Sequence, residues 1–423
     1  MWKSLAKFVW TLVLASPVLA ADFPAPNAAQ PLAPPSFGSP PLGNTYADPF
    51  FAPPGGMPVM DPSRPGSGAA AADTFVPPSR PFRSERLWVA GDFYFAAGQG
   101  TLLPPLVTTA PAGQSGALNQ PTTTTLFGGE RKLQYARPGL RATAGIWLTE
   151  DYRFGFDTTL MYLADRSSEF TGTATPGGPI LARPLTVAGL GLSIAVPVGT
   201  FAPGTLSARA HTAVIGGDAN FRYGLTTSEL GRLDLLVGYR YGNLRDTVDV
   251  ESRSQFAANP IGLSTFPTLP SLDFAVSDHF RTLNQFHGAQ VGLGGTHRLF
   301  DRLTLTTKGT VAIGVNISDV TISGQTFTVA GASNGGLLTG NNNIGTYREN
   351  QFAVVPEGTL KLGWDFTDRF RVNAGYSFLY WTKVRRAADQ IDTTIQAGSR
   401  PAFRNYDTDY WIQGWTVGLD LRW

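Results

Sequence analysis

The chain has 423 residues, with 33 Lys and Arg against 31 Asp and Glu, 48 Gly and no Cys. A formal net charge of +2 predicts neither nucleic-acid binding nor an acidic partner. The absence of cysteine excludes disulfides and cysteine-based metal sites. No run approaches the roughly 18 apolar residues of a membrane helix. A mean hydropathy of −0.05 is nevertheless compatible with membrane strands, whose alternation averages out.

Residues 1–20 are predicted to be a secretory signal. Lys3 and Lys7 precede a short apolar stretch at 8–14, and residues 18–20 read Val-Leu-Ala, which suits cleavage. The apolar stretch is too short to cross a bilayer. The alternative is a short N-terminal helix of a cytosolic protein.

Residues 21–83 differ in composition from the rest of the chain. Sixteen of the 32 prolines lie between Asp22 and Phe82. Such a segment buries too little apolar surface to order itself, so we expect a disordered, semi-rigid periplasmic tether. It is either a plain spacer or a segment that contacts peptidoglycan or a periplasmic partner.

Residues 84–423 are predicted to form the folded domain, and its last segment, 410–423, is the most informative. One face of this strand carries mostly apolar residues: Trp411, Gln413, Trp415, Val417, Leu419, Leu421 and Trp423. The other carries small or polar residues, ending in Asp420 and Arg422. This pattern is typical of the terminal strand of an outer-membrane β-barrel. We expect the outer-membrane assembly machinery to recognise it as an insertion signal through Trp415, Val417, Leu419, Leu421 and Trp423.

Nine earlier segments alternate in the same way. They lie at about 87–96, 140–148, 153–162, 218–223, 233–242, 288–293, 303–316, 354–364 and 370–380. Short turns alternate with long connections at about 98–138, 165–210, 251–278, 318–350 and 385–408. This asymmetry predicts an all-β, antiparallel transmembrane barrel of ten strands with both termini in the periplasm.

Two points of the fold stay open from the sequence. Twelve strands result if Val187–Val198 and Val320–Val329 add a hairpin, although these segments could instead extend strands beyond the bilayer. A soluble β-sandwich is the other architecture, but five long structureless loops would be abnormal in a compact soluble domain.

Charged residues fall on the face opposite the apolar one, which we therefore expect to look inward, since Arg or Lys facing lipid costs about 2–4 kcal/mol at the midplane. The predicted lumen-lining residues are Asp92, Arg141, Arg153, Asp157, Asp218, Arg222, Asp234, Arg240, Lys308, Glu357, Lys361, Arg371, Asp420 and Arg422. Ten strands leave little open space. The residues form either an ion-pair network across the lumen or the lining of a small polar pore.

The sequence predicts no catalytic residues, no metal site and no cofactor. It has four histidines, His211, His279, His287 and His297. Asp278 and His279 are adjacent on a strand and so point to opposite faces. His287 shares its face with apolar residues, which suggests lipid contact. No His, Asp and Glu spacing is typical of metal ligands.

Several short segments of the sequence together indicate a family. They are Glu85–Asp92, Leu103–Thr109, Leu126–Gly129, Leu181–Pro184, Gly231–Arg240, Asn284–Gly292, Val355–Glu357, Gly375–Trp381, Val384–Arg386 and Asp389–Asp392. In these segments the chain resembles putative β-barrel porin family seven. This family consists of outer-membrane barrels found mainly in planctomycete bacteria. The resemblance covers about 85–423. It implies an outer-membrane, porin-like protein, and it implies neither a substrate nor catalytic residues.

The resulting hypothesis is passive, porin-like passage of small polar solutes through a narrow charged lumen, in the outer membrane of a diderm bacterium. A structural or adhesive surface barrel with a closed lumen is the second hypothesis. A membrane-embedded hydrolase is the third. The lipid bilayer is the expected partner in each case, and nucleic acid is not.

Overall fold

A computed structural model of the chain describes residues 86–423 except 201, 257–271 and 329–330. The predicted signal and tether lie outside these residues and stay predictions. In the described part, no helix has the length and apolar character needed to cross a membrane.

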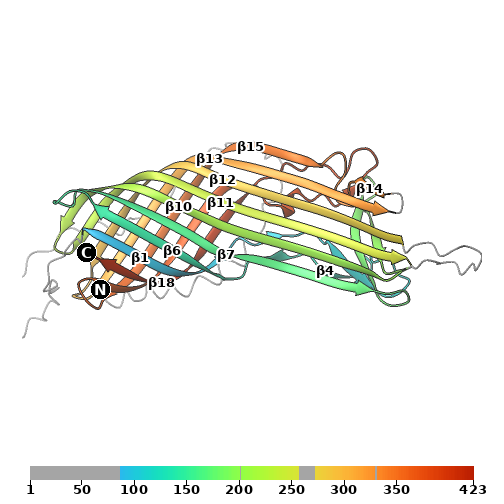
Figure 1. Cartoon of the computed structure of the whole chain (residues 1–423), viewed down its shortest axis with the longest axis horizontal. Helices are drawn as coiled ribbons and strands as arrows, with labels where there is room; N and C mark the ends of the chain where they lie inside the picture. The colour runs from blue at the N-terminus through green and yellow to red at the C-terminus, as the bar shows by residue number, and fades with distance from the viewer. Residues whose placement is uncertain (1–85, 201, 257–271, 329–330) are drawn as a thin grey trace, which may run out of the picture. The chain divides into compact units, whose positions relative to one another are not determined.

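Ten antiparallel strands close into a ring in the described part of the chain (Figure 1). They are β1 (Leu87–Gly98), β6 (Arg137–Trp147), β7 (Phe154–Ala174), β10 (Gly204–Ser228), β11 (Gly231–Phe256), β12 (Leu272–Arg298), β13 (Leu303–Thr328), β15 (Gly345–Asp365), β16 (Phe370–Val384) and β18 (Thr408–Arg422). Each pairs with the next in this order, and β18 pairs with β1. The predicted fold class and the count of ten are confirmed.

The ring closes between the first and last strands. Phe93 lies opposite Val417, and the backbone N–H of Leu87 donates to the Trp423 carbonyl at 2.9 Å. The N–H of Trp423 donates back to the Leu87 carbonyl at 2.8 Å. Because the ring has no free edge, every strand can place its backbone groups in a medium that offers no hydrogen bonds.

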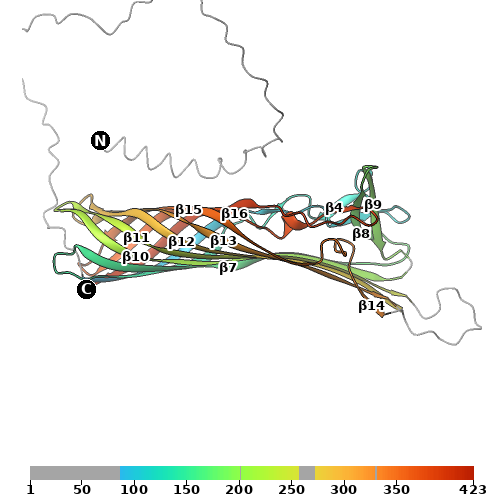
Figure 2. The ribbon, with the colours of Figure 1, turned by 90° about the horizontal axis from the view of Figure 1, so that it is seen from above.

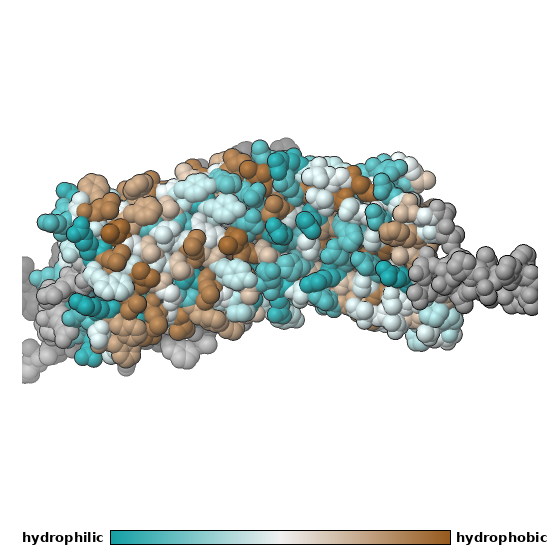
Figure 3. Space-filling view, in the orientation of Figure 1, coloured by the Kyte–Doolittle hydropathy of each residue, from teal (hydrophilic) through white to brown (hydrophobic). Residues whose placement is uncertain are grey.

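Large apolar side chains cover the outside of one part of the barrel. In β18, Val417 is 59% exposed whereas its neighbour Thr416 is 1% exposed. Figure 3 shows these apolar residues gathered around the part of the barrel that holds the C-terminus. Other members of this belt are Leu140, Leu160, Phe221, Val237, Val291, Ile313 and Phe352. A continuous belt of this kind fits the hydrocarbon of a bilayer and would be exceptional on a soluble protein.

The belt ends at the same register position on the neighbouring longer strands. On β11 the outward residues are apolar or aromatic up to Tyr241, and from Asn243 onward they are polar. On β15 the same change occurs between Phe352 and Asn350. The strand register connects these positions, since Asn243 lies opposite Gln285, Gln285 opposite Ile317, and Ile317 opposite Asn350. We take this level as the outer boundary of the hydrocarbon.

The strands continue well beyond that boundary. β11 has 26 residues and β12 has 27, whereas a membrane crossing needs about 9–11. The predicted long loops at 165–210, 251–278 and 318–350 are therefore wrong over much of their length. The physical reason is that alternation persists outside the bilayer with polar residues on the outer face, a pattern that resembles a polar loop in composition.

The extended strands β7, β10–β13 and β15 form a wall, and segments from the other connections form a cap facing it (Figure 2). The cap holds a small sheet of β3 (Val107–Ala110), β4 (Thr124–Phe127), β8 (Ile180–Val187), β9 (Leu192–Val198) and β17 (Thr394–Ile395). Shorter pieces are β2 (Thr101–Leu102), β5 (Arg131–Lys132), β14 (Gly331–Asn334) and the 3-10 turn η1 (Ala388–Gln390). Residues 187–198 thus contribute to a hairpin outside the ring, and residues 320–328 extend β13.

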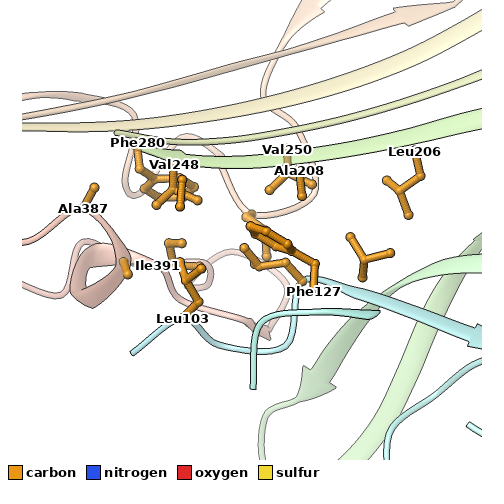
Figure 4. Packing of buried hydrophobic residues seen from close by; sticks show 14 of the residues in the cluster. Leu103, Phe127, Leu206, Ala208, Val248, Val250, Phe280, Ala387 and Ile391 are labelled. Atoms are coloured by element: carbon orange, nitrogen blue, oxygen red, sulfur yellow. The ribbon is translucent and has the colours of Figure 1, made fainter. Parts of the chain in front are cut away.

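Apolar packing holds the cap against the wall (Figure 4). The wall contributes Leu206, Val248, Val250 and Phe280, among others, from its inner face. The cap contributes Leu103, Phe127, Ala387 and Ile391. Burying one large apolar side chain stabilises a fold by about 1.5–3 kcal/mol, so a cluster of this size fixes the cap in place.

The belt yields a prediction about charge on the outer face. Val291→Arg puts a guanidinium in the middle of the belt and should lower the free energy of unfolding by about 2–4 kcal/mol. Ser277→Arg lies on the same strand and the same face but beyond the boundary, so it should cost about 0–1 kcal/mol. Urea unfolding in lipid vesicles measures both, and equal losses would contradict the boundary.

Candidate functional site

The interior of the barrel at mid-height is crossed by an ion-paired layer. Glu357 on β15 accepts a hydrogen bond from Arg141 Nη2 at 2.7 Å, and Arg240 is paired with its other oxygen. These residues stand on β15, β6 and β11, which are three to four strands apart around the ring. The three side chains therefore meet inside the lumen rather than along the wall.

Further partners extend this layer. Lys308 Nζ lies 2.9 Å from Asp218 Oδ1, and Arg240 Nη2 lies 3.4 Å from Asp218 Oδ2. The Arg141 guanidinium lies 5.4 Å from the centre of the Tyr94 ring, a cation–π contact. All of these side chains except Lys308 are at least nine-tenths buried.

A second charged layer lies nearer the short turns. Arg222 donates to Asp157 at 3.1 Å and to Asp234 at 2.9 Å. The same guanidinium lies over the rings of Trp88 and Trp147, which are 5.6 Å apart. The Trp88 ring occupies the space where Gly145 lacks a side chain. The two tryptophans of the polar face thus fill the interior.

The opposite side of this layer is also paired. Lys361 Nζ lies 2.5 Å from Asp92, and Arg371 Nε lies 2.6 Å from Asp365. Arg422 lies 3.6 Å from Asp420. A cavity of about 210 Å³ remains between the two sides and is lined by charges of both signs.

An apolar layer fills the barrel interior above the ion-paired layer. The Trp381 ring, on β16, reaches across to Gly242 on β11, where an added Cβ would lie 3.1 Å from the ring. Phe286 packs edge-on against this ring with centroids 6.1 Å apart. Tyr94, Val214, Leu244, Val355 and Ile412 belong to the same buried cluster.

The end of β16 and the segment that follows it run inside the extended wall. Asn316 Nδ2 donates to the Lys383 carbonyl at 2.7 Å, and Asn284 Nδ2 donates to the Arg385 carbonyl at 2.8 Å. The Arg386 side chain is paired with Asp246 and also contacts Thr101. This segment occupies the lumen at the level where the hydrocarbon belt ends.

A buried ion pair connects the cap to the wall. Arg183 of β8 is paired with Asp278 of β12, and both side chains are almost completely buried. Asp278 also accepts the backbone N–H groups of Leu337 at 3.2 Å and Leu338 at 2.9 Å. The Asp278 carboxylate thus binds two connections to the inner face of the wall. One joins β7 to β10 and carries Arg183, and the other joins β13 to β15 and carries Leu337 and Leu338.

The structure places thirteen of the fourteen predicted lumen-lining residues on the inner face. They are Asp92, Arg141, Asp157, Asp218, Arg222, Asp234, Arg240, Lys308, Glu357, Lys361, Arg371, Asp420 and Arg422.

Arg153 is the correction to that prediction. It is exposed and lies 5.7 Å from the ring of Tyr223, a residue of the outer face. The reason is that β7 begins only at Phe154, so Arg153 belongs to the turn. The strand alternation that would aim it inward does not apply there.

Sequence reasoning missed part of the buried charge. Arg183, Asp246, Arg385 and Arg386 were not proposed as interior residues because their segments were assigned to loops or to no strand. Two of the segments that carry the family resemblance could have pointed to these residues. Leu181–Pro184 contains Arg183, and Val384–Arg386 contains Arg385 and Arg386.

Two histidines pair with carboxylates on the outer face of the wall. His279 Nδ1 lies 2.8 Å from Asp249, and His211 Nε2 lies 3.3 Å from Asp165. Ser323 lies opposite His279 in the register, but no hydrogen bond joins their side chains. Within the described residues, no three His, Asp or Glu side chains gather as metal ligands.

The closed ring, the apolar belt and the charged interior define an outer-membrane β-barrel. The family model described as Putative beta barrel porin-7 matches residues 88–423. The chain belongs to this family, and the resemblance seen in the sequence is confirmed.

Several solved structures are similar to this chain at low sequence identity. The outer membrane protease OmpT of Escherichia coli has 11% identity and a TM-score of 0.38, covering 80% of this chain and 97% of its own. The translocator domain of autotransporter NalP of Neisseria meningitidis has 13% identity and a TM-score of 0.28, covering 81% and 90%. A FadL homologue of Pseudomonas aeruginosa has 9% identity and a TM-score of 0.25, covering 79% and 89%. The sequence matches none of the curated proteins with which it was compared.

The ion-paired layer yields a stability prediction. Glu357→Gln leaves Arg141 and Arg240 buried without their shared carboxylate and should lower the free energy of unfolding by about 3–5 kcal/mol. Glu251→Gln, on the exposed outer face of β11, should change it by less than about 0.5 kcal/mol. Urea unfolding of both refolded variants provides the comparison, and a Glu357→Gln variant as stable as its control would contradict the layer's role.

The outer histidine pair yields a pH prediction. The hydrogen bond to the Asp249 carboxylate raises the pKa of His279 above its ordinary value of 6.5, although partial burial opposes the effect. The pair therefore stabilises the fold below the unfolded pKa, and this contribution is lost as the pH rises through the folded pKa. Titration by histidine NMR should show a lower pKa in Asp249→Asn. No change would refute the pairing.

Proposed function

We propose that this protein is a closed-lumen surface barrel in the outer membrane of a diderm bacterium. In this proposal it is not an enzyme. The lipid bilayer and the outer-membrane assembly machinery are its partners, with β18 as the assembly signal. The tether at 21–83 would connect the barrel to the periplasm. Its structural or adhesive function would depend on the wall and cap, which lie outside the membrane.

The contact of Trp381 with Gly242 is the single observation that carries this proposal. The Trp381 ring of β16 fills the space that a side chain at Gly242, four strands away around the ring, would need. The Glu357 layer lies on one side of this contact, and the segment holding Arg385 and Arg386 lies on the other. A solute would have to displace a packed aromatic ring and also break buried ion pairs.

Porin-like passage of small polar solutes is the second candidate. The family description and the 210 Å³ cavity lined by both signs of charge favour it. In that case the Trp381 contact would be a gate that opens. The two candidates differ in whether the unmodified protein conducts ions.

Planar-bilayer recording separates them. The full chain should give no steady ion conductance. Trp381→Ala removes the ring that spans the lumen but leaves the ion-paired layer, so it should conduct only weakly. Trp364→Ala removes a tryptophan from the outer face of β15 and should behave like the unmodified chain. Steady conductance steps from the unmodified protein would overturn the closed-lumen proposal and favour passage.

Folding must be separated from conductance in this test. Removing a buried tryptophan costs about 3–5 kcal/mol, so the heat-dependent shift in gel mobility of folded barrels checks each sample first. Trp381→Leu keeps part of the packing and provides a second variant. If both folded variants remain closed, the Glu357 layer closes the lumen without Trp381.

A further inference from the structure

Two arginines on the outer face of the wall stand out because they have no ion-pair partner. Arg245 on β11 and Arg281 on β12 both face outward and are exposed. Their neighbours Arg209, His211 and His279 are each paired with a carboxylate. Among the residues that the structure describes, no carboxylate lies within ion-pair distance of Arg245 or Arg281.

The register places these two arginines next to each other. Arg245 lies opposite Leu283. Arg281 comes two residues before Leu283 on β12 and lies opposite Thr247. Such diagonal neighbours on one face of a sheet lie about 7–8 Å apart. Two cations at this spacing repel each other, so an anion bound between them would relieve the repulsion, and the Thr247 hydroxyl could donate to it.

The height of the pair fits the headgroup region of a bilayer. Arg245 is the next outward residue after Asn243, where the apolar belt ends. One outward step is about 6.8 Å along a strand, or roughly 5 Å of height at the tilt of a membrane barrel. Arg245 therefore lies about 5 Å and Arg281 about 10 Å above the Asn243 level. The headgroup layer occupies about 5–8 Å on each side of the hydrocarbon. Arg245 starts within this layer, and Arg281 starts just above it and reaches it with its long, flexible side chain.

The surface below and beside the pair suits an amphiphile. Val237 and Val291 expose apolar surface on the same two strands. Between them and the arginines, the Tyr239 hydroxyl is joined to His287 Nδ1 at 2.6 Å, and Asn243 Nδ2 donates to the Tyr241 hydroxyl at 3.2 Å. Above these aromatic residues, a groove of about 470 Å³ begins at Thr247 and Arg281. It continues along Arg209, His211, Asp249 and His279, and Arg245 lies outside its lining.

We propose that Arg245 and Arg281, with Thr247 between them, bind the phosphate headgroup of an anionic lipid whose chains lie along the belt at Val237 and Val291. Arginine suits this role because its planar guanidinium donates two parallel hydrogen bonds to phosphate oxygens. The inference rests on the membrane placement proposed above and does not depend on whether the lumen is closed.

Native mass spectrometry of the full chain in nanodiscs tests the site. One disc set contains only zwitterionic phosphatidylcholine, and the other adds phosphatidic acid, whose headgroup is an exposed phosphate. The unmodified protein should retain phosphatidic acid after release from the disc. Affinity should fall about 5-fold for Arg245→Gln or Arg281→Gln alone and about 25-fold for both together.

Arg253→Gln is the matched control, because Arg253 is exposed on the same face of β11 but far above the headgroups. It should retain the lipid like the unmodified protein. Gel mobility confirms that each variant is folded, and the conductance measurement is run on the same samples. Loss of lipid retention with unchanged conductance would support this site independently of the lumen proposal.

Three results would overturn the proposal. The first is equal retention of phosphatidic acid and phosphatidylcholine by the unmodified protein. The second is an equal loss in Arg253→Gln and the double variant. The third is displacement of the lipid by millimolar inorganic phosphate, which would show that a free anion rather than a lipid is the ligand.

Discussion

The structure depends on one constraint, which is that the two faces of each strand meet different surroundings. The outer face meets hydrocarbon, where a charge is expensive, and the inner face must then hold the charges of the chain. A ring of ten strands leaves little room inside. Charged side chains from distant strands therefore meet at the centre, as Glu357 does with Arg141 and Arg240. The burial of these charges therefore follows from hydrocarbon outside the ring together with little room inside it.

A second consequence follows where the hydrocarbon ends. Beyond Tyr241 the alternation on β11 continues, but the outer residues become polar and the inner residues Val248 and Val250 become apolar. Here the outer face meets water. The apolar inner face must be buried against other apolar side chains rather than face a water-filled space. The cap supplies it, which explains why connections that could have been free loops fold back onto the wall.

The sequence predicted the ring well because its signal is local. Alternation in 410–423 or 233–242 needs no knowledge of distant contacts, and it correctly predicted ten strands. It underestimated the strands beyond the membrane because Arg245, Thr247 and Asp249 read like loop residues. It also could not predict which charges meet, since the pairing of Arg183 with Asp278 depends on how the cap folds. Arg153 was misplaced for a related reason, because strand ends are not fixed by periodicity.

The central claim is that hydrocarbon wets the outer face of β11 up to Tyr241 and no further. The chain has no natural cysteine, so single cysteines at outward positions 235, 237, 239, 243, 245 and 247 can each carry a nitroxide spin label in lipid vesicles. Collision rates with oxygen, which concentrates in hydrocarbon, should exceed those with a water-soluble nickel complex at 235–239. The order should reverse at 243–247. Dominant collisions with the nickel complex at all six positions would contradict the account.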